Sequence, residues 1–138
     1  MRIRYPVLIA ILCSPIGCNE GDRAEVSGTV SLNGTAIEEG SISFIPVEGN
    51  NGPEVGAVIN KGRYHIPRSL GVMVGKNRVE LKAFRNSGRK VQDPTGPPGT
   101  LAEERVAAFP PEYNERSTLF RDVNKGSNTI DFDIRTMP

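Results

Sequence analysis

The sequence predicts an all-β fold, an antiparallel sandwich of about seven short strands. Three features predict it. Apolar and polar residues alternate with a period of two over several short segments, as in strands that are buried on one face. Turn-forming residues separate these segments, and the 138-residue chain contains 15 Gly and 11 Pro. No segment carries a sustained apolar stripe at the helical period.

The first half of the domain is expected to hold four strands joined by tight turns. Asn33-Gly34 is a strong tight-turn signal. Asn60-Lys61-Gly62 supplies a second turn, because glycine accepts the positive φ that such turns need. The expected strands are residues 26–32, 40–47, 55–59 and 63–66, with Val26, Gly28, Val30, Leu32, Ile42 and Phe44 on the inner faces.

The second half is expected to hold three strands and one long loop. The strands are residues 76–84, 117–123 and 128–135, with Val79, Leu81, Ala83, Ile130, Phe132 and Ile134 facing inward. Residues 85–116 contain five prolines, which cannot donate to a sheet ladder, so this segment is predicted to be a loop. Within it, Leu101–Ala108 could form a turn or two of helix. Long loops are often functional, so a protein or glycan partner is expected at 85–116.

The N-terminus reads as a secretory signal peptide over residues 1–17. Arg2 and Arg4 form a cationic start, and residues 7–13 form an apolar run. This run is shorter than the roughly 20 residues that a membrane-spanning helix needs. Export from the cytoplasm is therefore predicted.

Ile16-Gly17-Cys18 resembles the lipobox of bacterial lipoproteins, although Pro15 stands where an aliphatic residue is usual. The resemblance implies that Cys18 becomes the first mature residue and carries acyl chains. Two or more chains anchor a protein stably. We therefore expect a membrane-anchored protein of the cell envelope, facing the periplasm or exposed at the cell surface. Its tether would be residues 18–23 and its domain residues 24–138.

Charge and cysteine content exclude several function classes. Without Arg2 and Arg4 the chain has 15 Lys and Arg against 16 Asp and Glu, which is no footprint for nucleic acid. The other cysteine, Cys13, lies in the signal peptide. The domain is thus expected to have no disulfide and no thiolate metal site.

The residue types of an active site are sparse, so we expect no enzyme, no cofactor and no metal. His65 is the sole histidine and is expected to point outward from its strand. No Gly-x-Ser-x-Gly elbow accompanies it. Asp122, Asp131 and Asp133 are outward carboxylates, too few and too strand-bound for a calcium loop.

Charged residues also gather in the predicted loop. Arg85, Arg89 and Lys90 could meet an acidic partner, although a solubilising role is the alternative. Glu103-Glu104-Arg105 is expected to be a solvated loop or a short helical face.

Taken in order, several motifs resemble those of small lipoproteins abundant in planctomycete bacteria, which carry a transthyretin-like or carboxypeptidase-regulatory-like domain. The similarity covers residues 24–135. It implies a seven-stranded immunoglobulin-like sandwich, lipid-anchored and without assigned catalysis. The motifs are Val26–Val30, Gly40–Pro46, Lys61–Tyr64, Gly75–Val79, Pro111–Asn114, Ser117–Leu119 and Lys125–Asn128.

The same fold houses hydroxyisourate hydrolases, but their several histidines and Tyr-Arg-Gly-Ser terminus are not found in this sequence. The leading hypothesis is a non-catalytic, lipid-anchored envelope lipoprotein with a structural or protein- or glycan-binding role. The alternative is an accessory domain of an envelope hydrolase that acts with a partner chain.

Overall fold

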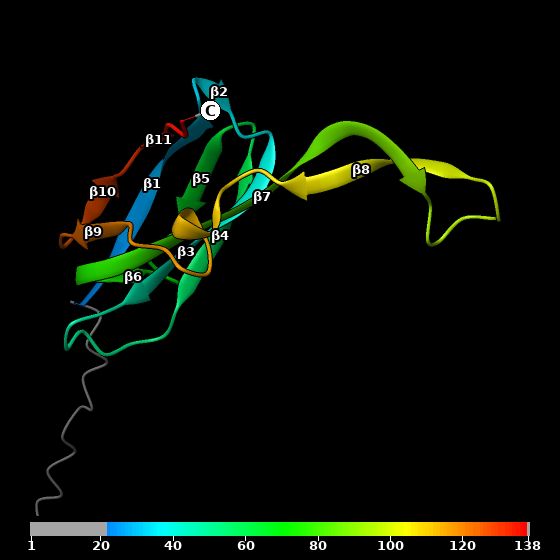
Figure 1. The fold of residues 1–138 in the computed structure, drawn as a ribbon. Helices are drawn as coiled ribbons and strands as arrows, with labels where there is room; N and C mark the ends of the chain where they lie inside the picture. Colours follow the sequence, from blue (N-terminus) through cyan, green and yellow to red (C-terminus); the bar gives the residue numbers. More distant parts are fainter. Residues whose placement is uncertain (1–21, 138) are drawn as a thin grey trace, which may run out of the picture.

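The computed structural model describes residues 22–137, which form an all-β body and a projecting two-stranded arm (Figure 1). The predicted all-β class is confirmed. Eleven strands lie in the described part of the chain: β1 (Arg23–Leu32), β2 (Thr35–Ala36), β3 (Glu39–Pro46), β4 (Val55–Asn60), β5 (Arg63–Ile66), β6 (Val72–Met73), β7 (Gly75–Gln92), β8 (Leu101–Ala107), β9 (Phe120–Val123), β10 (Ser127–Thr129) and β11 (Phe132–Ile134).

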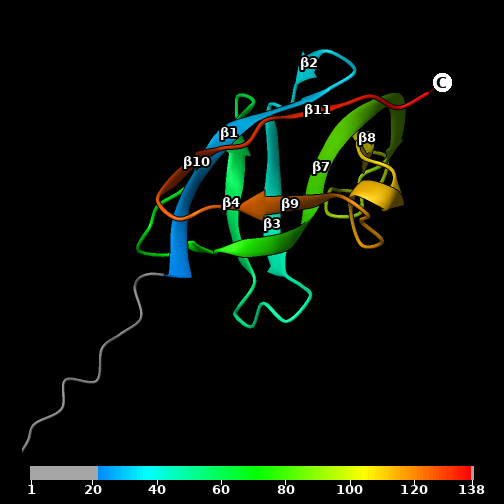
Figure 2. The ribbon, with the colours of Figure 1, turned by 90° about the vertical axis from the view of Figure 1, so that its left-hand side faces the viewer.

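The body is one curled, largely antiparallel sheet (Figure 2). Its strand order is β10-β1-β5-β4-β3-β7-β8, and β9 pairs with the first part of β7. A short 3₁₀ helix at Pro111–Tyr113 precedes β9. The curl brings the two ends of the sheet together, because β9 lies against β7 while β10, four residues later, lies against β1.

The C-terminal pairing departs from the antiparallel prediction. β10 and β11 both pair with β1 in the parallel direction, with Val26 opposite Asn128 and Val30 opposite Phe132. Period-two alternation is the same in parallel and antiparallel strands, so the sequence pattern could not show this direction.

The core confirms most of the inward assignments. Val26, Val30, Ile42, Phe44, Val79, Leu81, Ala83, Phe132 and Ile134 are all buried, whereas Ile130 and Leu32 are only partly buried. Phe44, Tyr64 and Phe132 meet at its centre, with ring centroids 6.2 to 6.5 Å apart. Such aromatic clusters add to the energy of apolar burial.

The loop prediction for residues 85–116 is wrong for most of that segment. β7 continues to Gln92 and turns back as β8, so residues 84–107 form a β-hairpin, which we call the arm. The prolines do avoid the strands: Pro94, Pro97 and Pro98 lie in the tip, and Pro110 and Pro111 follow β8. The prolines rule out strand structure only at their own positions. The prediction wrongly applied the same exclusion to the residues around them.

The helical prediction for Leu101–Ala108 is also wrong, because Leu101–Ala107 is β8. Its exposed and half-buried residues alternate strictly, as in a strand. Within the arm the register shifts between Asn86 and Lys90, where Gly88 has a φ of 82°. A bulge with a glycine in this conformation increases the local twist.

Candidate functional site

The arm leaves the body at the end opposite to the chain's entry. Arg23, which begins β1, pairs with Met73, two residues before β7 begins. β7 then crosses the whole body against β3, as far as Ala83 opposite Gly40. The arm starts at the next residue, so it projects away from the end at which β1 begins (Figure 1).

The arm is held together by its own side chains. Ser87 donates a hydrogen bond of 2.6 Å from its hydroxyl to Oε2 of Glu104. The Nε of Arg89 lies 3.9 Å from the same carboxylate oxygen. The Arg105 guanidinium stacks over the ring of Phe84, 5.6 Å from its centroid. Glu104 therefore belongs to the hairpin's inner contacts, unlike the solvated loop or helix face that the sequence predicted.

The tip of the arm is closed by an aspartate turn. The Asp93 carboxylate accepts hydrogen bonds from the Thr95 backbone N–H at 2.8 Å and from the Thr95 hydroxyl at 2.7 Å. These bonds lower the pKa of Asp93 below its ordinary value, the backbone donor contributing most. This turn orders the proline-rich tip without contact to the body.

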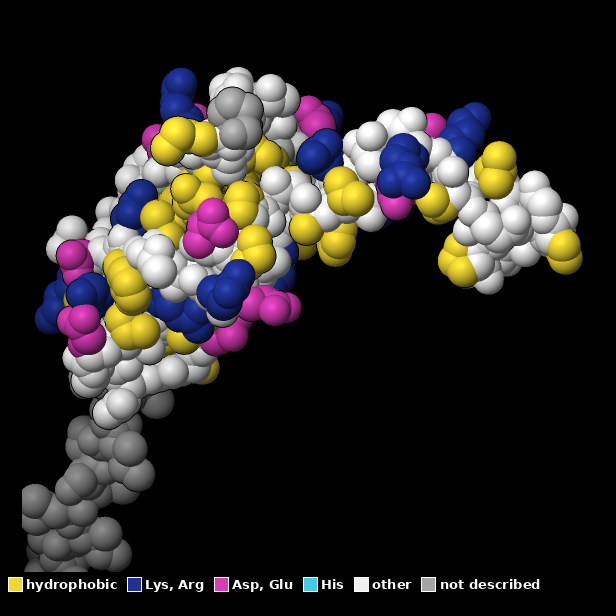
Figure 3. Space-filling view, viewed as in Figure 1, with side chains coloured by type: hydrophobic (Ala, Val, Ile, Leu, Met, Phe, Trp, Pro, Cys, Tyr) yellow, Lys and Arg dark blue, Asp and Glu magenta, His cyan; other side chains and the backbone are white. Residues whose placement is uncertain are grey.

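Apolar and cationic side chains remain exposed along the arm. Phe84 and Leu101 are each 60% exposed, whereas the aromatic residues of the core are below 5%. Arg85, Arg89 and Lys90, the cluster singled out in the sequence, all lie on the arm and are exposed. Figure 3 shows the basic and apolar groups distributed along its length. Single exposed apolar residues are common on protein surfaces, so the arm is a candidate contact surface because these groups lie on an element that projects from the body.

A groove of about 710 Å³ lies at the root of the arm. Phe84, Arg85 and Arg105 line it on the arm side, and Glu38 and Glu39 line it on the body side. The root therefore combines an exposed aromatic ring with charges of both signs.

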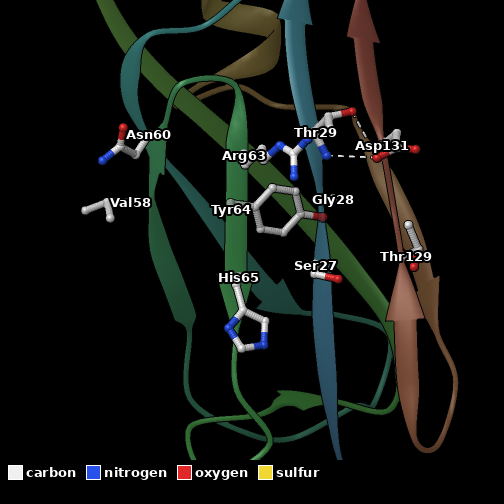
Figure 4. Close-up of a pocket in the computed structure, with 10 residues that line it drawn as sticks. All are labelled: Ser27, Gly28, Thr29, Val58, Asn60, Arg63, Tyr64, His65, Thr129 and Asp131. Atoms are coloured by element: carbon white, nitrogen blue, oxygen red, sulfur yellow. Dashed lines mark hydrogen bonds between the residues drawn. The ribbon is translucent and has the colours of Figure 1, made fainter.

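A second hollow, of about 730 Å³, lies on the outer face of β1, β4 and β5 (Figure 4). His65 points outward here, as predicted, and its Nε2 lies 3.1 Å from Oε1 of Glu25. Ser27 is the cross-strand neighbour of His65. Within residues 22–137, no hydrogen bond joins Ser27 Oγ to the imidazole, so a serine–histidine pair of the hydrolytic kind is not assembled.

Three further polar side chains of this hollow form hydrogen bonds within the protein: Thr29, Asp131 and Tyr64. Asp131 accepts hydrogen bonds from the backbone N–H of Thr29 at 2.8 Å and from its hydroxyl at 3.0 Å. The buried Tyr64 hydroxyl donates to the Ile130 carbonyl at 2.7 Å. Burial raises the pKa of Tyr64 well above its ordinary value, and the nearby Asp131 raises it further, so this hydroxyl stays a donor. Asp131 thus fastens the segment between β10 and β11 to β1, and Tyr64 fastens it to β5.

Asp133, which was also considered for calcium, has the same fastening role. Asp133 accepts a hydrogen bond of 2.9 Å from the Ser31 hydroxyl and pairs with Arg135 at 3.0 Å. No group of three or more His, Cys, Asp or Glu side chains suited to a metal ion occurs in residues 22–137.

The lipidation residue Cys18, the signal peptide 1–17 and most of the tether lie outside the described residues. Over the part that the structure describes, no helix is long and apolar enough to cross a membrane.

Comparison with known proteins yields little similarity. No family model matches the sequence, and no curated protein is similar to it. Among solved structures, the chain is similar to a DUF3823 family protein from Parabacteroides merdae, with 12% sequence identity and a TM-score of 0.41. The similarity spans 82% of this chain and 46% of that protein, so the chain covers less than half of its length. The function must therefore be argued from the residues of this chain.

Proposed function

We propose that this protein is a non-catalytic, lipid-anchored lipoprotein of the cell envelope that extends its arm from the body toward a protein or glycan partner. The observation that carries the proposal is the position of the arm. It begins at Phe84, at the opposite end of the body from Arg23, and Arg23 is the last residue of the expected tether 18–23. An anchor at one end and an exposed contact element at the other define a presenting module.

The tether favours a domain held close to the bilayer. Cys18 stands five positions before Arg23 in the sequence. A segment of this length reaches at most about 18 Å when fully extended. The body would therefore lie near the lipid headgroups, and the arm would begin at the end of the body opposite to the anchor.

We further propose that the curled sheet is a sandwich of the immunoglobulin-like, transthyretin-like kind. Its support is the weak link between β4 and β5, which pair through a single residue couple, Asn60 and Arg63. On one side of this link, β5 and the C-terminal strands pair with β1. On the other side, β4 and β7 pair with β3. Two strand groups joined at one corner, with the core between them, correspond to two packed layers.

The anchor is tested by cell fractionation and intact-mass measurement of the full chain. We expect the protein in the membrane fraction, with a mature chain that begins at Cys18 and carries added acyl mass. Cys18→Ser should release it from the membrane. A soluble, unmodified wild-type product that begins at another residue would refute the anchor.

The role of the arm is tested by shortening it. Replacing residues 85–106 by Asn-Gly keeps the Phe84–Ala107 pair and closes the hairpin with a favoured two-residue turn. Cross-linking in intact cells, followed by affinity capture, should then lose the partners that the full-length chain captures. The unchanged membrane fraction and melting temperature are the controls. Identical partners with and without the arm would refute its role.

A further inference from the structure

The arm has two unpaired strand edges. β8 ends the strand order of the sheet, so it pairs with β7 alone. The arm part of β7 has no neighbour besides β8, because β3 ends its pairing at Ala83. An isolated two-stranded ribbon is marginally stable in water, and its open edges are templates for strand addition.

The sequence of β8 is complementary to itself in the antiparallel direction. When two copies are centred on Glu104, Leu101 faces Ala107, Ala102 faces Val106, and Glu103 faces Arg105. Two-fold symmetry repeats each of these couples, so two Glu103–Arg105 pairs form at once. Apolar couples then flank a charged centre, and directly opposed charges of opposite sign stabilise strand pairing.

We propose that the partner of the arm is a second copy of this chain, bound by antiparallel pairing of β8 with β8 around a two-fold axis at Glu104. This rests on the proposed function, since it names the partner of the same contact element. The resulting four-stranded ribbon would satisfy one open edge of each arm.

The two Glu104 residues at the axis do not oppose this arrangement. Each accepts a hydrogen bond from Ser87 and lies beside Arg89 of its own chain, so its charge is compensated within the arm. The Arg105 guanidinium lies over the Phe84 ring and has no ion pair within the described residues, so it can pair with a carboxylate of the other copy. Antiparallel pairing points the two arms in opposite directions, so copies anchored in one membrane pair with their arms lying along the bilayer. In that orientation, anchoring raises the local concentration of arms and favours the pair.

Charges at a sheet edge prevent strand pairing in other proteins, so charge-reversal variants are needed to distinguish charges that prevent pairing from charges that direct it. In a dimer of the R105E variant, the carboxylate at position 105 of each copy faces Glu103 of the other copy, so two repulsive couples form. In K90E/E103R, two cations face each other, while Lys90→Glu preserves the hairpin's own cross-strand charge pair at 90 and 103. R68E, which reverses an exposed charge on the body, is the matched control.

The measurement is the concentration-dependent mass of detergent-extracted full chain by analytical ultracentrifugation. Wild type and R68E should dimerise alike. R105E and K90E/E103R should each dimerise at least about tenfold more weakly, since two attractive couples become repulsive. An equimolar mixture of these two variants should recover a dimer, because every opposed couple is again of opposite sign. A monomeric wild type, or a mixture that stays monomeric while both variants keep the wild-type melting temperature, overturns the proposal.

A cysteine at the axis gives a second, independent readout. Glu104→Cys should form an intermolecular disulfide on mild oxidation in membranes, since equivalent positions face each other. Leu101→Cys, which faces Ala107, should cross-link much less. Equal cross-linking of both variants would contradict the register. Self-pairing could fail while the shortened-arm variant still loses cross-linked partners of another kind. That result would keep the proposed function of the arm and refute only a second copy of this chain as its partner.

Discussion

The strand β7 begins in the body, where one of its faces is buried, and ends in the arm, where neither face is fully buried. From Asn77 to Ala83 every second residue is buried against the core. From Phe84 to Gln92 none is fully buried, although the strand continues through a bulge at Gly88. The body is therefore ordered by its own apolar core, whereas the arm is ordered by cross-strand contacts alone. Strand geometry does not by itself imply a buried face.

The sharpest contrast is expected between two phenylalanines. Phe44 is fully buried between the rings of Tyr64 and Phe132, whereas Phe84 is 60% exposed. Phe44→Ala should lower the free energy of unfolding by about 4 kcal/mol, because it removes apolar burial and leaves a cavity. Phe84→Ala should lower it by less than about 0.5 kcal/mol. Urea denaturation of both variants measures the difference, and equal losses would show that the arm shares the core.

A smaller loss of stability is expected where β1 packs against the segment between β10 and β11, a contact that we call the joint. A Cβ on Gly28 would lie 2.0 Å from the Ile130 carbonyl oxygen, so one backbone must move. Gly28→Ala should therefore cost about 3 kcal/mol of unfolding free energy. Ser27→Ala, one residue away on the outer face, is the control and should stay close to wild type. A neutral Gly28→Ala would mean that the joint is looser than the geometry indicates.

The body was largely predictable because burial and alternation agree there. Val79, Leu81 and Ala83 could be placed inward from the period alone, and so could His65 outward. The two-residue strands β2 and β6 carry too few residues to show a period, and they were missed. Ser117 was included in a predicted strand but lies outside β9, and its buried hydroxyl donates to the Val79 carbonyl.

The arm was not predicted, because its sequence combines loop-forming prolines with a weak strand pattern. Five prolines indicated a loop, and apolar and charged residues do not alternate in Leu101–Ala107, where Leu101 is exposed and Glu104 is half-buried. The contacts of the hollow on β1 and β5 join distant positions: Glu25 lies forty residues from His65, and Thr29 lies 102 residues from Asp131. Local pattern does not specify such pairs. A check for self-complementary charge order in β8 could have suggested a strand.

A modest loss of stability is expected on removal of the Tyr64 hydroxyl, which fastens β5 to the segment between β10 and β11. Tyr64→Phe removes the hydrogen bond to the Ile130 carbonyl and should cost about 1 kcal/mol of unfolding free energy. Tyr113→Phe is a matched control on a partly buried tyrosine outside this joint, and it should change stability by less than about 0.5 kcal/mol. Thermal unfolding followed by circular dichroism measures both. An equal response of the two variants would remove the special role of Tyr64.

The smallest effects are expected from two aspartates, one in each region. Hydrogen bonding from Ser31, then from Arg135, holds the pKa of Asp133 below its ordinary 3.8, and hydrogen bonding from Thr95 does the same for Asp93. A carboxyl group whose pKa is lower in the folded state stabilises that state above the unfolded pKa, and the stabilisation is lost as the pH falls through the folded pKa. Carboxyl resonances followed by NMR should therefore titrate below 3.8 at both positions.

The two aspartates should nevertheless differ in what their protonation loosens. Asp133 joins β11 to β1, so acidification below about pH 4 should lower the unfolding midpoint of the body, and Asp133→Asn should flatten that dependence. Asp93 joins only residues of the tip, so Asp93→Asn should leave the pH dependence of the body unchanged and alter only nearby amide resonances. If Asp93→Asn also shifted the unfolding of the body, the arm would be energetically continuous with the core, and its exposed strands would then not need a partner to explain their order.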